Sequence, residues 1–454
     1  MTSPQASSGP SVSFTRASRV WLRIALLSFG GPAGQIAVMH RILVDEKKWI
    51  SENRFLHALN YCMLLPGPEA QQLATYAGWM LHGTRGGLVA GTLFVLPGFV
   101  SILLLSVLYA GFQHIGLVQG LFFGIKAAVL AVVIEAVLRI GKRALKNAYM
   151  YAIAAGAFVA IFFLDLPFPL IIATAAFVGF IGSRVKPDKF VVITEHGAAS
   201  SDAIEGARTA KGRRAQPTLR RTLTVSAICL ALWFVPLIAL SSALGFDNVF
   251  TQIGLFFSKL AVVTFGGAYA VLAYMAQEAV QSYGWLEPGE MLDGLGMAET
   301  TPGPLIQVTQ FVAFMGAFRN AGGLDPMLAG VLASILATWV TFVPCFLWIF
   351  LGAPYVERLQ QNRSLSAALS AITAAVVGVI VNLAVWFGMH VVFDEVEQLR
   401  GYGVRLYLPG METVDFASLA LAAGAFVAML RFRVGMLPVI GTSAALGAFW
   451  FLVS

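Results

Sequence analysis

The chain has 454 residues, of which 58% are hydrophobic and only 12% charged, and its mean hydropathy is +0.78. These values exclude a soluble globular protein, in which about a quarter of the residues are charged. Several apolar runs are long enough to cross about 30 Å of hydrocarbon as helices. The clearest are 88–109, 117–138, 367–387 and 437–453. The composition therefore predicts an all-α polytopic membrane protein.

The net charge of +7 is concentrated in one part of the chain. Nine of the thirty Lys and Arg residues lie in 184–221, between two hydrophobic blocks. Such a segment is typical of a cytoplasmic loop that faces anionic lipid, so we expect a lipid bilayer as partner and no nucleic acid. Three widely spaced cysteines, Cys62, Cys229 and Cys345, favour neither a disulfide framework nor a zinc site, and no metal is expected.

Two long segments of the chain repeat one another. Residues 28–31 (Ser-Phe-Gly-Gly) recur as 264–267 (Thr-Phe-Gly-Gly), and the same offset of 236 matches 66–68 to 302–304, both Pro-Gly-Pro. It also pairs Gln71 with Gln307. The matches divide the chain into a cytoplasmic tail (1–19), a first transporter repeat (20–183), the basic cytoplasmic loop (184–221), a linking transmembrane helix (222–245) and a second repeat (246–454).

Lys and Arg in short loops predict which loops are cytoplasmic. By this rule 139–146 and the basic loop lie inside, whereas the acidic turn 390–415 lies outside. Six crossings, the linking helix and six more crossings give about 13 membrane segments, and the single linking helix inverts the second repeat. The loops 41–54 and 277–293 break the charge rule if the first two segments of each repeat cross. Those segments are therefore either re-entrant hairpins or crossings with exceptional loops.

Inverted repeats are typical of secondary transporters, whose sites lie where helices are broken at matching places in both halves. The Pro-Gly-Pro motifs interrupt one helix and favour the start of another, whose free N–H groups attract anions. Kinking or packing is the better explanation of a single motif, but the recurrence at matched positions favours a substrate site. The predicted substrate-binding residues are Ser28, Gly30, Gly31, Pro66, Gly67, Pro68, Gln71, Lys126, Lys259, Thr264, Gly266, Gly267, Thr301, Pro302, Gly303, Pro304 and Gln307.

Ionisable side chains within apolar runs are costly and persist mainly for function. Lys126 and Lys259 are candidates for a positive field around an anion, with snorkelling toward lipid headgroups as the alternative. Glu69 and Glu299 flank the two breaks and are candidates to carry a coupling proton, or else to cap a helix. No Walker A motif occurs, so we expect the membrane potential or an ion gradient to drive transport.

The motifs at 29–32 (Phe-Gly-Gly-Pro), 64–68 (Leu-Leu-Pro-Gly-Pro) and 94–98 (Phe-Val-Leu-Pro-Gly), with their second copies, together resemble the chromate ion transporter family in its long two-domain form. The resemblance covers nearly the whole chain. It implies an inner-membrane exporter of chromate, or of a similar dianion such as sulfate, with no cofactor. The second half departs from the pattern, because Ala268 replaces the proline equivalent to Pro32 and Cys345 follows Pro344 in place of glycine.

Two other functions stay open on the residues alone. One is transport of another small anion. The other is an intramembrane lipid-phosphate phosphatase, which is disfavoured because the sequence offers no paired acid and base, no metal-ligand cluster and no G-x-S-x-G nucleophile. We therefore expect a transporter without enzyme activity, with a homodimer among its expected assemblies.

Overall fold

The computed structural model describes residues 12–190, 219–265, 268–352 and 362–453. Helices dominate all four ranges, which confirms the predicted all-α class. The first half contains α1 (Phe14–Leu27), α2 (Gly31–His40), η1 (Arg41–Glu46), α3 (Glu52–Cys62), α4 (Glu69–Phe112), α5 (Gly116–Ala144), α6 (Ala148–Phe162), α7 (Phe168–Val185) and α8 (Pro187–Phe190). After α10 (Leu219–Leu244), the second half contains α11 (Val249–Val263), α12 (Ala268–Gln277), η2 (Glu278–Ser282), α13 (Pro288–Thr300), η3 (Leu305–Gln307), α14 (Val308–Arg319), α15 (Pro326–Gly352), α17 (Arg363–Val392), β1 (Val396–Gly401), β2 (Val404–Pro409), η5 (Met411–Thr413), α18 (Phe416–Leu430) and α19 (Met436–Val453).

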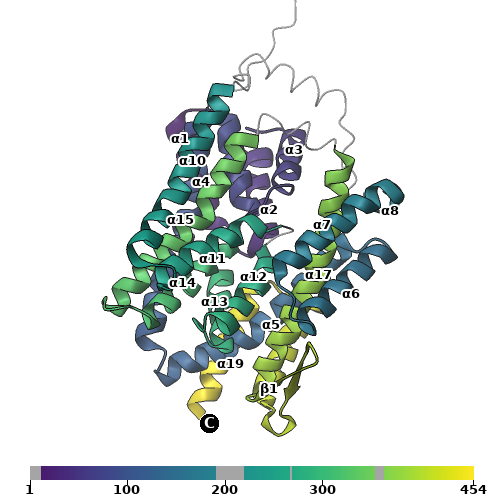
Figure 1. Cartoon of the computed structure of the whole chain (residues 1–454). Helices are drawn as coiled ribbons and strands as arrows, with labels where there is room; N and C mark the ends of the chain where they lie inside the picture. Colours follow the sequence, from purple (N-terminus) through teal and green to yellow (C-terminus); the bar gives the residue numbers. More distant parts are fainter. Residues whose placement is uncertain (1–11, 191–218, 266–267, 353–361, 454) are drawn as a thin grey trace, which may run out of the picture.

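The order of elements in the first half is repeated in the second. The pair α1 and α2 corresponds to α11 and α12, α3 to α13, and the long helix α5 to α17. The halves interlock, because α19 at the end of the second half packs along α5, and α7 at the end of the first half packs along α17 (Figure 1). Each repeat therefore completes its core with the last helix of the other.

Each repeat begins with a hairpin of short helices. Helix α1 has 14 residues, which is about 21 Å of helix and less than the roughly 30 Å of a hydrocarbon core. The chain then turns back, since Nη1 of Arg23 in α1 lies 3.4 Å from Oε2 of Glu46 at the end of η1. In the second repeat Trp285, which follows η2, packs its ring 5.8 Å from that of Phe256 in α11. The first helix of each repeat is therefore shorter than a full crossing, whereas contact between the two segments fits both alternatives.

Helix α4 also reverses direction. Its backbone leaves helical geometry at His82 and Gly83, so the 44 residues form two helices joined at a sharp kink. The ring of His82 lies 2.7 Å from the carbonyl oxygen of Val12, just before α1. The kink therefore lies beside the start of α1, and the second part of α4 packs back against the first.

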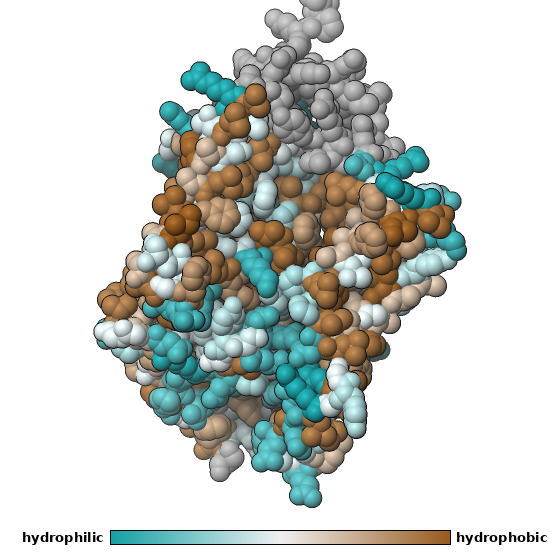
Figure 2. All heavy atoms as spheres, viewed as in Figure 1, coloured by the Kyte–Doolittle hydropathy of each residue, from teal (hydrophilic) through white to brown (hydrophobic). Residues whose placement is uncertain are grey.

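Seven of the described helices are long and apolar enough to cross a membrane, and four shorter helices are apolar. In α17, 72% of the most apolar window is buried inside the protein, whereas in α10 only 11% is. Helix α17 is thus a central helix and α10 a peripheral one. Hydrophobic residues cover both flanks of the face in Figure 2, over α10 and α15 on one side and α6 and α7 on the other, as lipid contact requires. Hydrophilic residues gather over the lower middle of this face.

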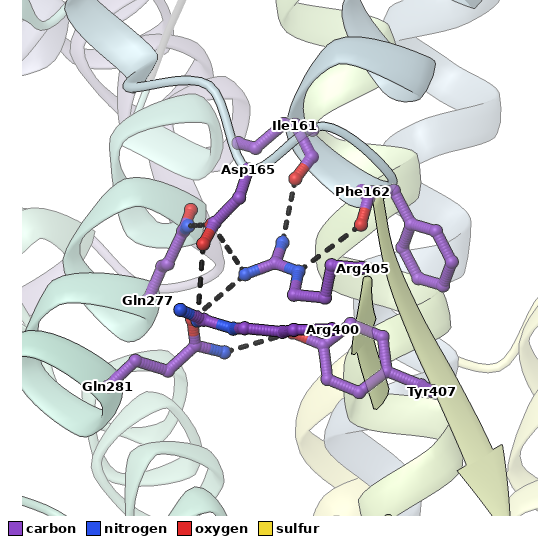
Figure 3. A network of polar contacts seen from close by, with 8 residues as sticks. All are labelled: Ile161, Phe162, Asp165, Gln277, Gln281, Arg400, Arg405 and Tyr407. Carbon is purple, nitrogen blue, oxygen red and sulfur yellow. Dashed lines mark hydrogen bonds and ion pairs between the residues drawn. The ribbon is translucent and has the colours of Figure 1, made fainter. Parts of the chain in front are cut away.

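A two-stranded hairpin, β1 and β2, ties the halves together at the lower end of Figure 1. Arg405 of β2 is only 3% exposed. Its guanidinium donates hydrogen bonds to the carbonyl oxygens of Ile161 and Phe162 in α6, at 2.7 and 3.3 Å (Figure 3). It also pairs with Asp165 after α6 at 2.5 Å and reaches Gln281 of η2 at 3.1 Å. Arg405 therefore links the first repeat to two parts of the second.

Candidate functional site

The two helix breaks predicted from the repeats meet at the interface between the halves. The backbone N–H of Gly67 donates to the carbonyl oxygen of Thr264 at 2.8 Å. Reciprocally, the N–H of Gly303 donates to the carbonyl oxygen of Ser28 at 2.9 Å. Thus the Pro-Gly-Pro break of each repeat is joined to the end of the first helix of the other repeat.

The structure requires glycine at both breaks, because of the backbone conformation there and because a side chain would not fit. Gly67 has φ of +117° and Gly303 has φ of +105°, a region that other residues rarely adopt. A Cβ on Gly303 would lie 3.0 Å from the Cα of Gly98, and one on Gly67 would lie 3.1 Å from Sγ of Cys345. Gly98 and Cys345 follow the matched prolines of the two repeats. Each break is thus packed against the equivalent position of the opposite repeat.

The two hydroxyl groups beside the breaks are buried and bonded within their own helices. Oγ of Ser28 donates to the carbonyl oxygen of Ile24, and Oγ1 of Thr264 donates to that of Leu260, both at 2.6 Å. Neither residue is measurably exposed. These donors therefore close the last turns of α1 and α11 in the described conformation.

Buried amide side chains surround the breaks. Nε2 of Gln71 donates to Oγ1 of Thr75 at 3.1 Å, and Nε2 of its equivalent, Gln307, donates to Oε1 of Gln310 at 2.7 Å. Gln35, which the sequence did not single out, donates from Nε2 to the carbonyl oxygen of Gly303 at 2.6 Å. The Oε1 atoms of Gln35, Gln71 and Gln307 accept no hydrogen bond from the described residues. A polar layer thus crosses an otherwise apolar core.

The remaining predicted residues of the two motifs lie around the same interface. Pro68 and Pro304 are the N-terminal caps of α4 and η3, and neither helix start has a side-chain cap. The carbonyl oxygen of Pro66 accepts a hydrogen bond from Gln72 at 2.7 Å, and the carbonyl oxygen of Pro302 faces Gly98. Thr301 donates to the carbonyl oxygen of Ala298 at 3.4 Å. In the Gly-Gly motif of the first repeat, Gly30 and Gly31 both have positive φ. Their equivalents Gly266 and Gly267 lie outside the described residues.

A family model described as chromate transporter matches residues 15–180 and 251–448. The chain belongs to the chromate transporter family. The two matched regions coincide with the two repeats, so the two-repeat helical membrane fold predicted from the sequence is confirmed. Membership supports transport of chromate across a membrane and a multi-pass membrane location.

Curated relatives agree with this family. The chain is 30% identical to a chromate transport protein of Pseudomonas aeruginosa, over 82% of this chain and 80% of the relative. It is 27% identical to a chromate transport protein of Cupriavidus metallidurans, over 82% of each chain. A probable chromate transport protein of Synechococcus elongatus is 25% identical, over 85% of this chain and 87% of the relative. No solved structure matches the chain.

Glu299, one of the two predicted coupling acids, forms a buried pair with Tyr269 beside the breaks. Glu299, at the end of α13, is fully buried, and its Oε1 accepts a hydrogen bond from the hydroxyl of Tyr269 at 2.5 Å. A Cβ on Gly31 would lie 3.6 Å from that hydroxyl, so the pair adjoins the first repeat's Gly-Gly motif. The other acid, Glu69, opens α4 and is half-buried. Repeat comparison missed Tyr269, because its equivalent in the first half is Ala33.

The two predicted lysines have partners away from the breaks. Nζ of Lys126 in α5 lies 3.4 Å from Oδ2 of Asp293, on the helix that leads to the second break. Lys259 is exposed on α11, and its ammonium lies 5.4 Å from the centre of the Tyr274 ring. In the described conformation, therefore, the polar groups beside the breaks include backbone amides, hydroxyls and glutamines, with Glu299 nearby.

Proposed function

We propose that this protein exports chromate, or a similar tetrahedral dianion such as sulfate, from the cytoplasm across the inner membrane through the paired helix breaks. The reciprocal hydrogen bonds of Gly67 and Gly303 carry this proposal. They lie at the interface between the two repeats, where inverted-repeat transporters bind their substrates. The names of the relatives in Pseudomonas aeruginosa and Cupriavidus metallidurans support chromate as the anion.

A dianion that enters low dielectric loses a hydration energy much larger than one hydrogen bond returns, so several donors must converge on it. The N–H groups of Gly67 and Gly303 are two such donors, and both are bonded to carbonyl oxygens of the opposite repeat. Moving one repeat relative to the other breaks both bonds together. The anion then takes the place of the two carbonyl oxygens, with the side-chain amides of Gln71 and Gln307 beside it.

The starts of α4 and η3 add a favourable field. Both begin at the breaks without a side-chain cap, so their first N–H groups are available to an anion. The hydroxyls of Ser28 and Thr264 rotate about Cα–Cβ and reach the same region once the last helical turns loosen. Because the two repeats have opposite orientations, they present equivalent donors to the two sides of the membrane, which suits alternating access.

The membrane potential already favours expulsion of a dianion, by about 4 to 5 kcal/mol per 100 mV for two charges. The sequence contains no Walker A motif. We therefore propose that this potential or an ion gradient drives export. Of the two predicted coupling acids, Glu299 is fully buried next to the breaks, whereas Glu69 is half-buried.

Everted membrane vesicles test this function directly. Vesicles that contain the protein are expected to accumulate labelled chromate, with competition by sulfate, and vesicles without it are not. Collapse of both the potential and the proton gradient, with ATP kept high, should abolish accumulation. Equal accumulation in vesicles with and without the protein would overturn the transport proposal, and accumulation that survives the collapse would overturn the proposed driving force.

A further inference from the structure

A cavity of about 390 Å³ lies apart from the breaks, between the end of α4, the first part of α5 and the start of α13. Its polar lining includes Tyr109, His114, Lys126, Glu287, Glu290 and Asp293. The side chain of Lys126 is 32% exposed, whereas that of Asp293 is 2% exposed. The cavity therefore connects a buried carboxyl group with a partly exposed lysine.

Asp293 has both of its partners on one oxygen. The hydroxyl of Tyr109 donates to Oδ2 at 2.8 Å, and Nζ of Lys126 lies 3.4 Å from the same atom. Oδ1 is buried and accepts no hydrogen bond within the described part of the chain. An ionised carboxylate in this environment is costly unless both oxygens are satisfied. Oδ1 is thus a site where a proton would lower the cost of burial.

The other charged groups around Asp293 are committed to structural contacts. Both oxygens of Glu290 accept hydrogen bonds from Arg319 of α14, at 2.5 and 2.7 Å. Glu287 caps α13, and its own N–H donates to Oε2 of Glu290 at 2.9 Å. His114, in the turn between α4 and α5, also lines the cavity. His114 is exposed, whereas Asp293 is buried, so Asp293 with Lys126 is the buried pair whose charge can change without breaking a helix cap.

The charge balance indicates a positive ligand. Three carboxyl groups face two cations, Lys126 and Arg319, so the cavity repels an anion while Asp293 is ionised. Within the described ranges no three His, Cys, Asp or Glu residues are arranged to hold a metal ion. Lys126 beside Asp293 further opposes a metal cation. A proton needs only the one free oxygen that Asp293 offers.

We propose that Asp293 is a proton-binding site that couples a proton to anion transport; this rests on the proposed function. A proton from the cavity adds to Oδ1 and neutralises the carboxyl group, so the Lys126 ammonium loses its counter-ion and turns toward water. Loss of the proton restores the pair. Asp293 lies on α13, which ends at Thr300 directly before the second break, so the change at Asp293 moves the helix that leads to Thr301 and Gly303.

Asp293→Asn in the purified full-length protein, reconstituted in liposomes, tests the coupling. Chromate exchange at equal concentrations on both sides needs no driving force, whereas net accumulation under a pH gradient, at zero potential, needs a coupled proton. In the wild type one pH unit should change the accumulation ratio about tenfold per proton. Asp293→Asn should keep exchange and lose this response. Glu287→Gln, which removes the same charge from the same cavity, should keep both.

The outcomes separate the two proposals. A full response to the pH gradient in Asp293→Asn, or a response of the wild type to a sodium gradient alone, overturns the proton site. Absence of exchange in the wild type overturns the transport proposal instead. The proton site is then judged by infrared difference spectra of a pH titration, in which Asp293→Asn should lack a band of a protonated carboxyl group that Glu287→Gln retains. Identical spectra would reject it.

Discussion

The N–H of Gly67 donates to the carbonyl oxygen of Thr264 at 2.8 Å, and this bond joins the Pro-Gly-Pro break of the first repeat to the first helix of the second. The bond between Gly303 and Ser28 is its counterpart. Two equivalent contacts across one interface are what a pseudo-two-fold arrangement requires. The same two bonds lock the donors that we propose bind the anion, so binding and relative movement of the repeats are linked.

Replacement of either break glycine by leucine should abolish chromate resistance. A leucine at Gly67 or Gly303 must adopt positive φ, at a cost of about 1–3 kcal/mol, and its Cβ meets the opposite repeat. The matched control is Gly424→Leu in α18, where a Cβ meets nothing within 4 Å. Resistance should be compared at equal amounts of protein in the membrane. Full resistance in normally expressed Gly67→Leu and Gly303→Leu would exclude the breaks as the anion site.

Tyr269→Phe should destabilise the protein by about 1–3 kcal/mol, because Glu299 loses its hydroxyl donor in a fully buried place. Tyr274→Phe is the control, since the Tyr274 hydroxyl makes no hydrogen bond to another described residue although the ring is equally buried. Thermal unfolding of the detergent-solubilised proteins measures both changes. Equal losses of stability in the two variants would show that the hydrogen bond to Glu299 contributes nothing specific.

Repeat comparison predicted the positions of the breaks because Gly67 and Gly303 carry a backbone requirement that the chain meets in the same way twice. It also matched Ser28 to Thr264, and the structure places both at helix ends, after α1 and α11. Their pairing with the opposite break follows from the two-fold arrangement. The local sequence does not show where the hydroxyls of Ser28 and Thr264 point. In the structure, each donates to a carbonyl oxygen of its own helix.

Comparison of the repeats could not predict the contacts that have no equivalent in the other half. Tyr269 and Glu299 have no polar equivalents in the first half, and Asp293 is separated from Lys126 by 167 positions. Such pairs depend on how α5, α12 and α13 pack, which hydropathy does not encode. For the hairpin of β1 and β2, the sequence predicts only an acidic turn. In the structure, Tyr402 and Gly403 form its tight turn with positive φ.

The predicted topology places the basic loop around Arg213 in the cytoplasm and the segment around Glu412 outside. Arg213 lies outside the described residues, whereas Glu412 is exposed in η5. Single cysteines at the two positions should react with an impermeant reagent from opposite sides of the membrane. Native Cys62 and Cys345 are buried, so only Cys229 needs replacement by alanine. Labelling of both positions from one side would contradict the inverted arrangement.

Arg405→Ala should be the most damaging change at the lower end of the molecule, with a loss of about 3 kcal/mol of stability. Its guanidinium is buried and holds Asp165, two carbonyl oxygens of α6 and Gln281, so alanine leaves several polar groups of both repeats without their donor (Figure 3). Arg400 pairs with the same Asp165 at 3.2 Å but is 63% exposed. Because water screens an exposed pair, Arg400→Ala should cost less than about 1 kcal/mol. Thermal unfolding of the two variants decides the matter, and comparable losses would mean that Arg405 does not join the repeats.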